Sequence, residues 1–89
     1  MNAVITVTGK DTVGIIAKVS SECFRYNANI LDITQKVFGG MFVMTMLISV
    51  DELNIRFADF VDIMNDLAKK ENLVIHTMHE SIFDAMHNI

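Results

Sequence analysis

The segment from Met41 to Val50 constrains the fold more than any other part of this 89-residue chain. Its side chains alternate as those of a β-strand do, and both of the resulting faces are largely apolar. A strand that is apolar on both sides belongs in the interior of a sheet. We therefore expect a central strand with cover over each face. One face consists of Phe42, Met44, Met46, Ile48 and Val50, and the other of Met41, Val43, Thr45, Leu47 and Ser49.

Three further segments show the alternation of a strand. The first covers residues 3–8 and is expected to end at Gly9. The second covers residues 31–37 and is followed by Gly39-Gly40, a dipeptide typical of a tight turn, so it should form a hairpin with the central strand. The last covers residues 73–78. The apolar face that we expect the second strand to bury consists of Leu31, Ile33 and Val37.

Two segments follow helical periodicity instead. The first begins near Val13, with Asp11 or Thr12 as its expected N-cap and Asn27 as the left-handed residue that ends it. The second is amphipathic, with Asn54 as its expected N-cap. Residues 81–86 indicate a short C-terminal helical turn. The expected apolar faces consist of Ile15, Ile16, Val19, Cys23, Phe24 and Tyr26 in the first helix and of Phe57, Phe60, Val61, Met64, Leu67 and Ala68 in the second.

The order strand, helix, strand, strand, helix, strand favours one architecture. It is the α+β ferredoxin-like βαββαβ sandwich, a four-stranded antiparallel sheet with two helices on one face, here with a short helical tail and one domain over residues 1–89. This fold leaves one sheet face bare and places the strand at residues 31–37 on an exposed edge. Because 52% of the residues are apolar, we expect a second copy to complete the core in a homodimer.

Composition excludes several classes of function. The net charge of −4 leaves no basic surface for phosphate backbones, so neither nucleic acid nor membrane is an expected partner. Cys23 is the only cysteine, which rules out an intramolecular disulfide and a soft two-cysteine copper site. Residues 1–8 carry no signal-peptide pattern, and together with the single cysteine this indicates a cytoplasmic protein.

No residue pattern indicates an active site. An acylphosphatase-like enzyme would need an arginine in the loop after the first strand, where this chain offers only Lys10. His76 and His79 lie three apart on a strand, so their rings should point to opposite faces and cannot easily share a metal ion. We therefore expect a protein that is not an enzyme and holds no metal or cofactor.

The turn between the first strand and the first helix is the most distinctive candidate site. Free backbone N–H groups at a helix N-terminus bind small carboxylates, and Gly14 lets a ligand approach the backbone closely. From spacing alone, the same residues are equally consistent with an ordinary cap, in which Asp11 or Thr12 bonds to these N–H groups.

The residues from Gly9 to Ala17, followed by the run from Asn27 to Ile30 and by Asp32, resemble the signature of the ACT domain, a regulatory module that binds small molecules. With its ending at residues 81–89, the chain resembles the small stand-alone ACT proteins of the UPF0237 type. The resemblance implies a sensor of an amino acid or related carboxylate, bound where two domains pair side by side. It also implies a regulated enzyme or regulator as a further partner.

Carried over by position, the resemblance implies a ligand site shared between two chains. One chain would contribute Asp11, Thr12, Val13, Gly14 and Ile15, and the other would contribute Asn29, Ile30 and Asp32. Considered without the resemblance, Asn29 is equally well explained as a turn residue. Asp32 is better explained as a charge on an edge strand, where it prevents pairing with a further strand. The alternative function is a ligand-free protein-interaction module or an accessory subunit of a metabolic enzyme.

Three positions depart from the family pattern. Val13 stands where members often carry proline, and Asn27 stands where they often carry glycine. Gly9 occupies a place where some amino-acid-binding members put a polar side chain. These departures do not change the expected fold. They affect which ligand the site binds and whether it binds one.

Overall fold

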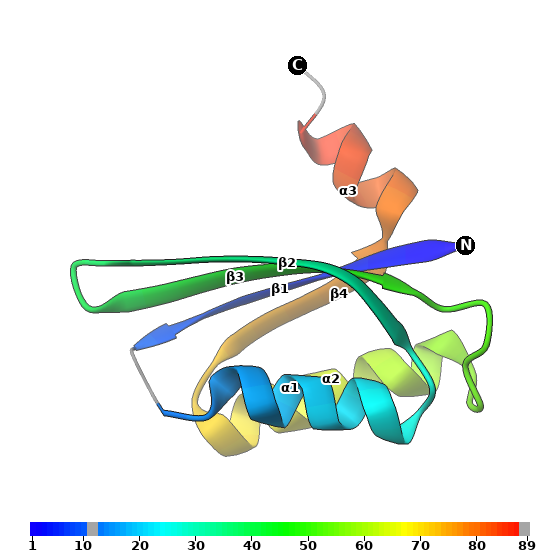
Figure 1. Cartoon of the computed structure of the whole chain (residues 1–89), viewed down its shortest axis with the longest axis horizontal. Helices are drawn as coiled ribbons and strands as arrows, with labels where there is room; N and C mark the ends of the chain where they lie inside the picture. The colour runs from blue at the N-terminus through cyan, green and yellow to red at the C-terminus, as the bar shows by residue number, and fades with distance from the viewer. Residues whose placement is uncertain (11–12, 88–89) are drawn as a thin grey trace.

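The computed structural model describes residues 1–10 and 13–87, apart from the side chain of Phe38. Its four strands form one antiparallel sheet in the order β2-β3-β1-β4. Helices α1 and α2 cover one face of this sheet, and α3 rises from the other (Figure 1). The elements are β1 (Asn2–Lys10), α1 (Ile15–Arg25), β2 (Asn29–Phe38), β3 (Met41–Ser49), α2 (Phe57–Glu71), β4 (Val74–His79) and α3 (Glu80–His87). The ferredoxin-like fold expected from the sequence is confirmed.

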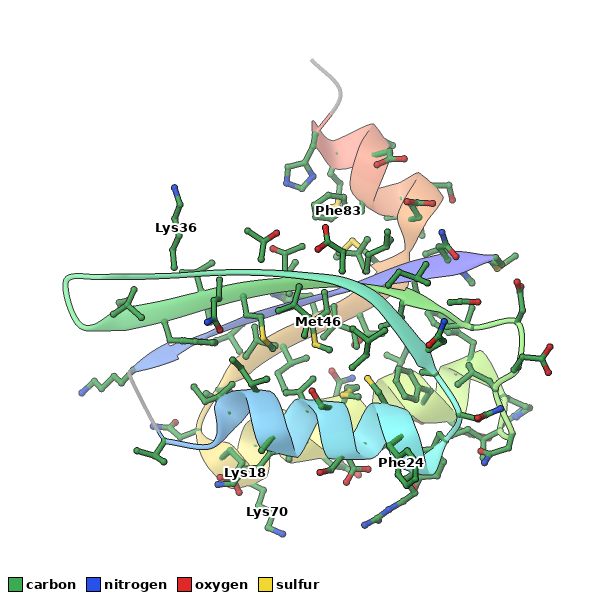
Figure 2. All side chains as sticks on the ribbon, viewed as in Figure 1. Lys18, Phe24, Lys36, Met46, Lys70 and Phe83 are labelled. Atoms are coloured by element: carbon green, nitrogen blue, oxygen red, sulfur yellow. The ribbon has the colours of Figure 1, made fainter. Side chains whose placement is uncertain are left out.

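Strand β3 lies between β2 and β1, as its two apolar faces predict. Its residues Met44, Met46 and Ile48 are fully buried, and Figure 2 shows Met46 in the layer between the sheet and the two helices. The opposite side of β3 is only partly buried. We call this side of the sheet, which faces away from α1 and α2, the open face. The other fully buried residues of the core are Ala3, Ile5, Val7, Val19, Cys23, Phe60 and Met64.

Helix α1 begins at Ile15 and buries Ile15, Val19 and Cys23, as expected. Phe24, in contrast, is 88% exposed, so its assignment to the buried face was wrong. Successive residues of a helix are rotated by about 100°, which turns Phe24 away from the side that Cys23 buries. Asn27, just beyond the helix, has the left-handed conformation predicted for it, with φ of 64°.

Helix α2 buries Phe60, Met64 and Ala68, as its pattern predicts. Its N-cap is Arg56 rather than Asn54, which corrects the sequence-based assignment. The Asn54 side chain instead donates a hydrogen bond of 3.2 Å to the carbonyl oxygen of Arg25, so it links the loop before α2 to the end of α1.

Strand β2 is the edge strand, and its apolar side is not buried as expected. Leu31, Ile33 and Val37 are each exposed on this edge strand. Val37 lies near the tip of the β2–β3 hairpin, which extends beyond the helices (Figure 1). Leu31 also lies at a register shift between Ile30 and Asp32, where β2 has one residue more than β3. The chain therefore leaves an apolar strip along one edge of its sheet.

The burial of Met46 predicts a large difference between two methionine substitutions on β3. Met46→Ala should lower the free energy of unfolding by about 2–5 kcal/mol, because it removes a fully buried side chain and leaves a cavity. Met41→Ala, at the exposed start of the same strand, should change it by less than about 1 kcal/mol. Urea denaturation of both variants tests this, and similar losses for the two would contradict the core described here.

Candidate ligand-binding site

The first half of the candidate site is the N-terminus of α1. Gly14 is the N-cap and has the left-handed conformation, with φ of 88°. The N–H of Lys18 donates to the Gly14 carbonyl oxygen at 2.9 Å, which begins the helical bonding. Within residues 1–10 and 13–87, no side chain caps the free N–H groups of Ile15, Ile16 and Ala17.

Exposure differs sharply between neighbouring residues at this terminus. Val13 is 99% exposed, whereas Ile15 is buried. The positive end of the helix dipole favours an anion here. The expected cap and the proposed ligand contacts of Asp11 and Thr12 fall outside the residues that the structure describes.

The packing of Leu73 explains why position 9 carries no side chain. A Cβ atom at Gly9 would lie 2.5 Å from Cδ2 of Leu73, well inside van der Waals contact. Leu73 is buried and follows Asn72, which ends α2 in the left-handed conformation. A polar side chain at position 9, as some amino-acid-binding members have, would therefore require Leu73 to move.

The second half lies at the other end of α1, where a hollow of about 390 Å³ opens to solvent. Asn29 is exposed here, while Ile30 is partly buried against the core. The amide nitrogen of Asn27 donates a hydrogen bond of 2.9 Å to the carbonyl oxygen of Glu52, which fixes one wall. The hollow is lined by Phe24, Asn27, Ala28, Asn29 and Glu52.

Phe24 and Glu52 line this hollow but were not predicted from the sequence. The helical rotation that separates Phe24 from Cys23 could have revealed an exposed aromatic ring beside Asn29. Glu52 lies in the loop after β3, and its position depends on the tertiary bond to Asn27, so no sequence signal marks it. Asp32 does not line the hollow and shares the open face with Leu47, the residue opposite it on β3.

One chain does not bring the two halves of the site together. Gly14 and Asn29 lie at opposite ends of α1 (Figure 1), a helix of 11 residues. At 1.5 Å per residue this helix is about 16 Å long, which exceeds the length of an amino acid. A small ligand that contacts both halves must therefore bind between two copies.

In the described part of the chain, the cysteine and the two histidines of β4 do not indicate a second site. Burial, helped by the charge of Glu22, raises the pKa of the Cys23 thiol to about 11, so it stays protonated at neutral pH. His76 lies opposite Thr6 on β1, and His79 lies opposite Ala3. The two histidine side chains therefore point to opposite faces of the sheet, as predicted. Among residues 1–10 and 13–87, no three potential metal ligands lie close enough to hold an ion.

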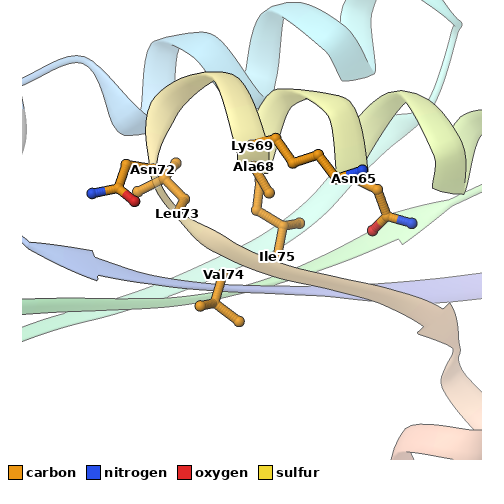
Figure 3. Close-up of a pocket in the computed structure, with 7 residues that line it drawn as sticks. All are labelled: Asn65, Ala68, Lys69, Asn72, Leu73, Val74 and Ile75. Carbon is orange, nitrogen blue, oxygen red and sulfur yellow. The ribbon is translucent and has the colours of Figure 1, made fainter.

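A second groove lies between α2 and the edge strand β4 (Figure 3). Its polar groups are the amides of Asn65 and Asn72 and the ammonium group of Lys69, and its floor includes Ile75. None of its lining residues carries a carboxylate, thiol or hydroxyl group. No helix in the described part of the chain is both long enough and apolar enough to span a bilayer.

Comparison with known proteins shows the family to which this chain belongs. A family model described as the ACT domain matches residues 2–77. The chain is 43% identical to a UPF0237 protein of Clostridium perfringens over the full length of both. It also superposes on an ACT domain protein from Streptococcus pneumoniae with a TM-score of 0.81 and 34% identity, covering 94% of each chain.

The chain belongs to the ACT domain family, and its relatives in that family are the small UPF0237 proteins. It shares its fold with a formyltetrahydrofolate deformylase from Pseudomonas syringae, at a TM-score of 0.79 and 23% identity, over 86% of this chain and 26% of that one. As an ACT domain, the protein is a regulatory ligand-binding module.

The conformation of Gly14 predicts a graded response to substitution. Gly14→Ala should destabilise the fold by about 1–2 kcal/mol, because a Cβ atom is strained at φ of 88°. Gly14→Asn should cost less, because asparagine tolerates the left-handed region, and Gly14→Val should cost more. Thermal denaturation tests this order, and equal stability of the three variants would contradict the assigned conformation.

The raised pKa of Cys23 predicts a poorly reactive thiol. At pH 8 a pKa of about 11 instead of 9.0 reduces the thiolate by about 100-fold, so maleimide labelling of the folded protein should be at least that much slower than in denaturant. Labelling should accelerate as the pH rises towards 11. Equal rates with and without denaturant would show that the thiol is accessible.

Proposed function

We propose that this protein is a homodimeric sensor that binds an amino acid, or a related small carboxylate, at two equivalent sites between its copies. Each site consists of residues 11–15 of one copy and of Asn29 and Ile30 of the other. The observation that carries the proposal is the position of Gly14 and Asn29 at opposite ends of one helix, too far apart for one small ligand.

A two-fold axis beside α1 and β2 would place the two α1 helices side by side and antiparallel. In such an isologous pair, the N-terminus of each helix lies beside the C-terminal end of the other, so both sites are completed at once. The exposed strip of Leu31, Ile33 and Val37 lies along the same edge. Pairing there would bury this strip, which supports the proposed dimer.

The chemistry of the two halves fits an amino acid. The free N–H groups of α1 suit an α-carboxylate, since they add hydrogen bonds to the positive end of the helix dipole. The carboxylate of Asp11 and the side-chain carbonyl of Asn29 are acceptors for an α-ammonium group. The exposed ring of Phe24 offers an apolar surface for the ligand's side chain.

A ligand held by both copies stabilises the arrangement of the dimer that forms the site. The difference between the free and bound arrangements is then sensed by a separate enzyme or regulator. Cys23 is free and buried, and we place the protein in the cytoplasm, where such a thiol remains reduced.

A thermal-shift screen of the twenty amino acids and common keto acids tests the ligand. A compound that binds only the folded dimer must raise the melting temperature, and the rise must grow with its concentration. We expect such a rise from at least one of these carboxylates at millimolar concentration. If none produces it, the sensor proposal fails and a ligand-free interaction module becomes the better account.

Mixing two inactive variants tests whether the site is shared between chains. Asp11→Ala and Asn29→Ala should each abolish binding while the dimer remains. When the two are mixed and allowed to exchange, half of the dimers should carry one intact site, so calorimetry should recover roughly a quarter of the wild-type capacity. Asn65→Ala, on the exposed face of α2, is the matched control and should bind normally.

Recovery in the mixture would be impossible for a site made within one chain. No recovery from two variants that still form dimers would therefore contradict the shared site. Loss of folding in either variant, seen by circular dichroism, would assign that residue a structural role instead.

A further inference from the structure

The hollow at the C-terminal end of α1 combines a carboxylate and an aromatic ring with no positive charge. Its lining residues are Phe24, Asn27, Ala28, Asn29 and Glu52. None of them is a lysine, arginine or histidine. The hollow opens to solvent and, at about 390 Å³, has room for an extended side chain. A ligand group that enters it therefore meets one negative charge and no cation from these residues.

Glu52 supplies a carboxylate that lacks an ion-pair partner. The residue is exposed, and no lysine, arginine or histidine among residues 1–10 and 13–87 forms an ion pair with it. Its backbone is held in place, because its carbonyl oxygen accepts the 2.9 Å hydrogen bond from the side chain of Asn27. The nitrogen of the Asn27 amide is used in this bond, so the oxygen of that amide remains as a further acceptor.

The ring of Phe24 adds a second feature that attracts cations. Figure 2 shows Phe24 at the C-terminal end of α1, and the residue is 88% exposed. The face of an aromatic ring carries partial negative charge and attracts ammonium and guanidinium groups. No other aromatic ring in the described part of the chain stacks on it. The ring is therefore available to a ligand.

The end of α1 has the same electrostatic preference. The C-terminus of a helix is the negative end of its dipole and favours a cation, just as the N-terminus favours an anion. Arg25 is the basic residue of the last turn of α1, but it lies 3.9 Å from the carboxylate of Glu22 and does not line the hollow. The carboxylate, the ring and the helix dipole thus all favour a positive charge in the hollow.

We propose that the ligand is a basic amino acid, with an ammonium or guanidinium group at the end of an unbranched side chain, and that this hollow binds that group. This assignment rests on the shared site proposed above, where the α1 N-terminus of the other copy binds the α-carboxylate. The stem of the ligand side chain lies along Phe24, and its terminal cation meets the carboxylate of Glu52. The two ends of such a ligand match the opposite dipole ends of two antiparallel α1 helices.

Calorimetry with matched pairs of compounds tests the charge. Norleucine is lysine with the ammonium group replaced by hydrogen, and citrulline has the size of arginine without its charge. Lysine and arginine should each bind about tenfold more tightly than the neutral counterpart, because an ion pair and a cation–π contact are added. Cadaverine, which is lysine without its carboxylate, should bind at least about tenfold more weakly than lysine, since it cannot use the α1 N-terminus. This last comparison distinguishes an amino acid from a polyamine.

Substitutions in the hollow test which residues select the cation. Glu52→Gln should weaken lysine binding by about fivefold and leave norleucine binding unchanged. Asp62→Asn, on the exposed side of α2, removes the same charge outside the hollow and is the matched control, so it should preserve the difference between the two ligands. Phe24→Leu keeps an apolar side chain without the ring, and it should weaken lysine binding by about threefold more than norleucine binding. Circular dichroism establishes that each variant is folded.

Two different failures can be told apart. If norleucine binds to the shared site as tightly as lysine, or if Glu52→Gln changes their ratio no more than Asp62→Asn does, the hollow does not select a cation. The assignment of a basic ligand is then overturned, and the shared site itself stands. If no amino acid or keto acid raises the melting temperature, the proposed sensor fails and the basic ligand fails with it.

Discussion

Met44, Met46 and Ile48 are completely buried between β3 and the two helices, and the positions of both halves of the candidate ligand site depend on this packing. Strand β3 pairs with β1 on one side and β2 on the other. Its register therefore determines where β1 ends and where β2 begins. Helix α1 connects those two points, so the core places the two halves of the site at the two ends of one rigid element.

The same architecture accounts for the surfaces that the chain leaves exposed. Two helices are narrower than the four-stranded sheet they cover, and the β2–β3 hairpin extends past them. The apolar strip on β2 lies at this edge of the sheet. In the proposed dimer, the strip is covered by the second copy that completes the ligand site.

Much of the fold could be predicted because local patterns and tertiary packing agree. The two apolar faces of β3 require an interior strand, and Asn27 is one of the few residue types suited to a left-handed position. The burial of β2 could not be predicted, since it depends on how far the helices reach. The bond from Asn54 to Arg25 likewise joins residues that are distant in sequence, and no local pattern distinguishes it from a cap.

Some residues of the candidate site could be named from the sequence, but their arrangement could not. The resemblance to ACT domains points to Gly14 and Asn29, yet only the structure shows that they lie at opposite ends of α1. Phe24 and Glu52 enter the site through helix rotation and a long-range hydrogen bond, and the motif contains neither.

The contact between Gly9 and Leu73 makes these two positions interdependent. The space that a side chain at position 9 would need is already occupied by a residue from the distant end of α2. A side chain at position 9 therefore requires Leu73 to shift or to be replaced by a smaller residue. In the proposed site, a buried leucine that does not line the ligand pocket would thus influence which side chains can stand beside the α1 N-terminus.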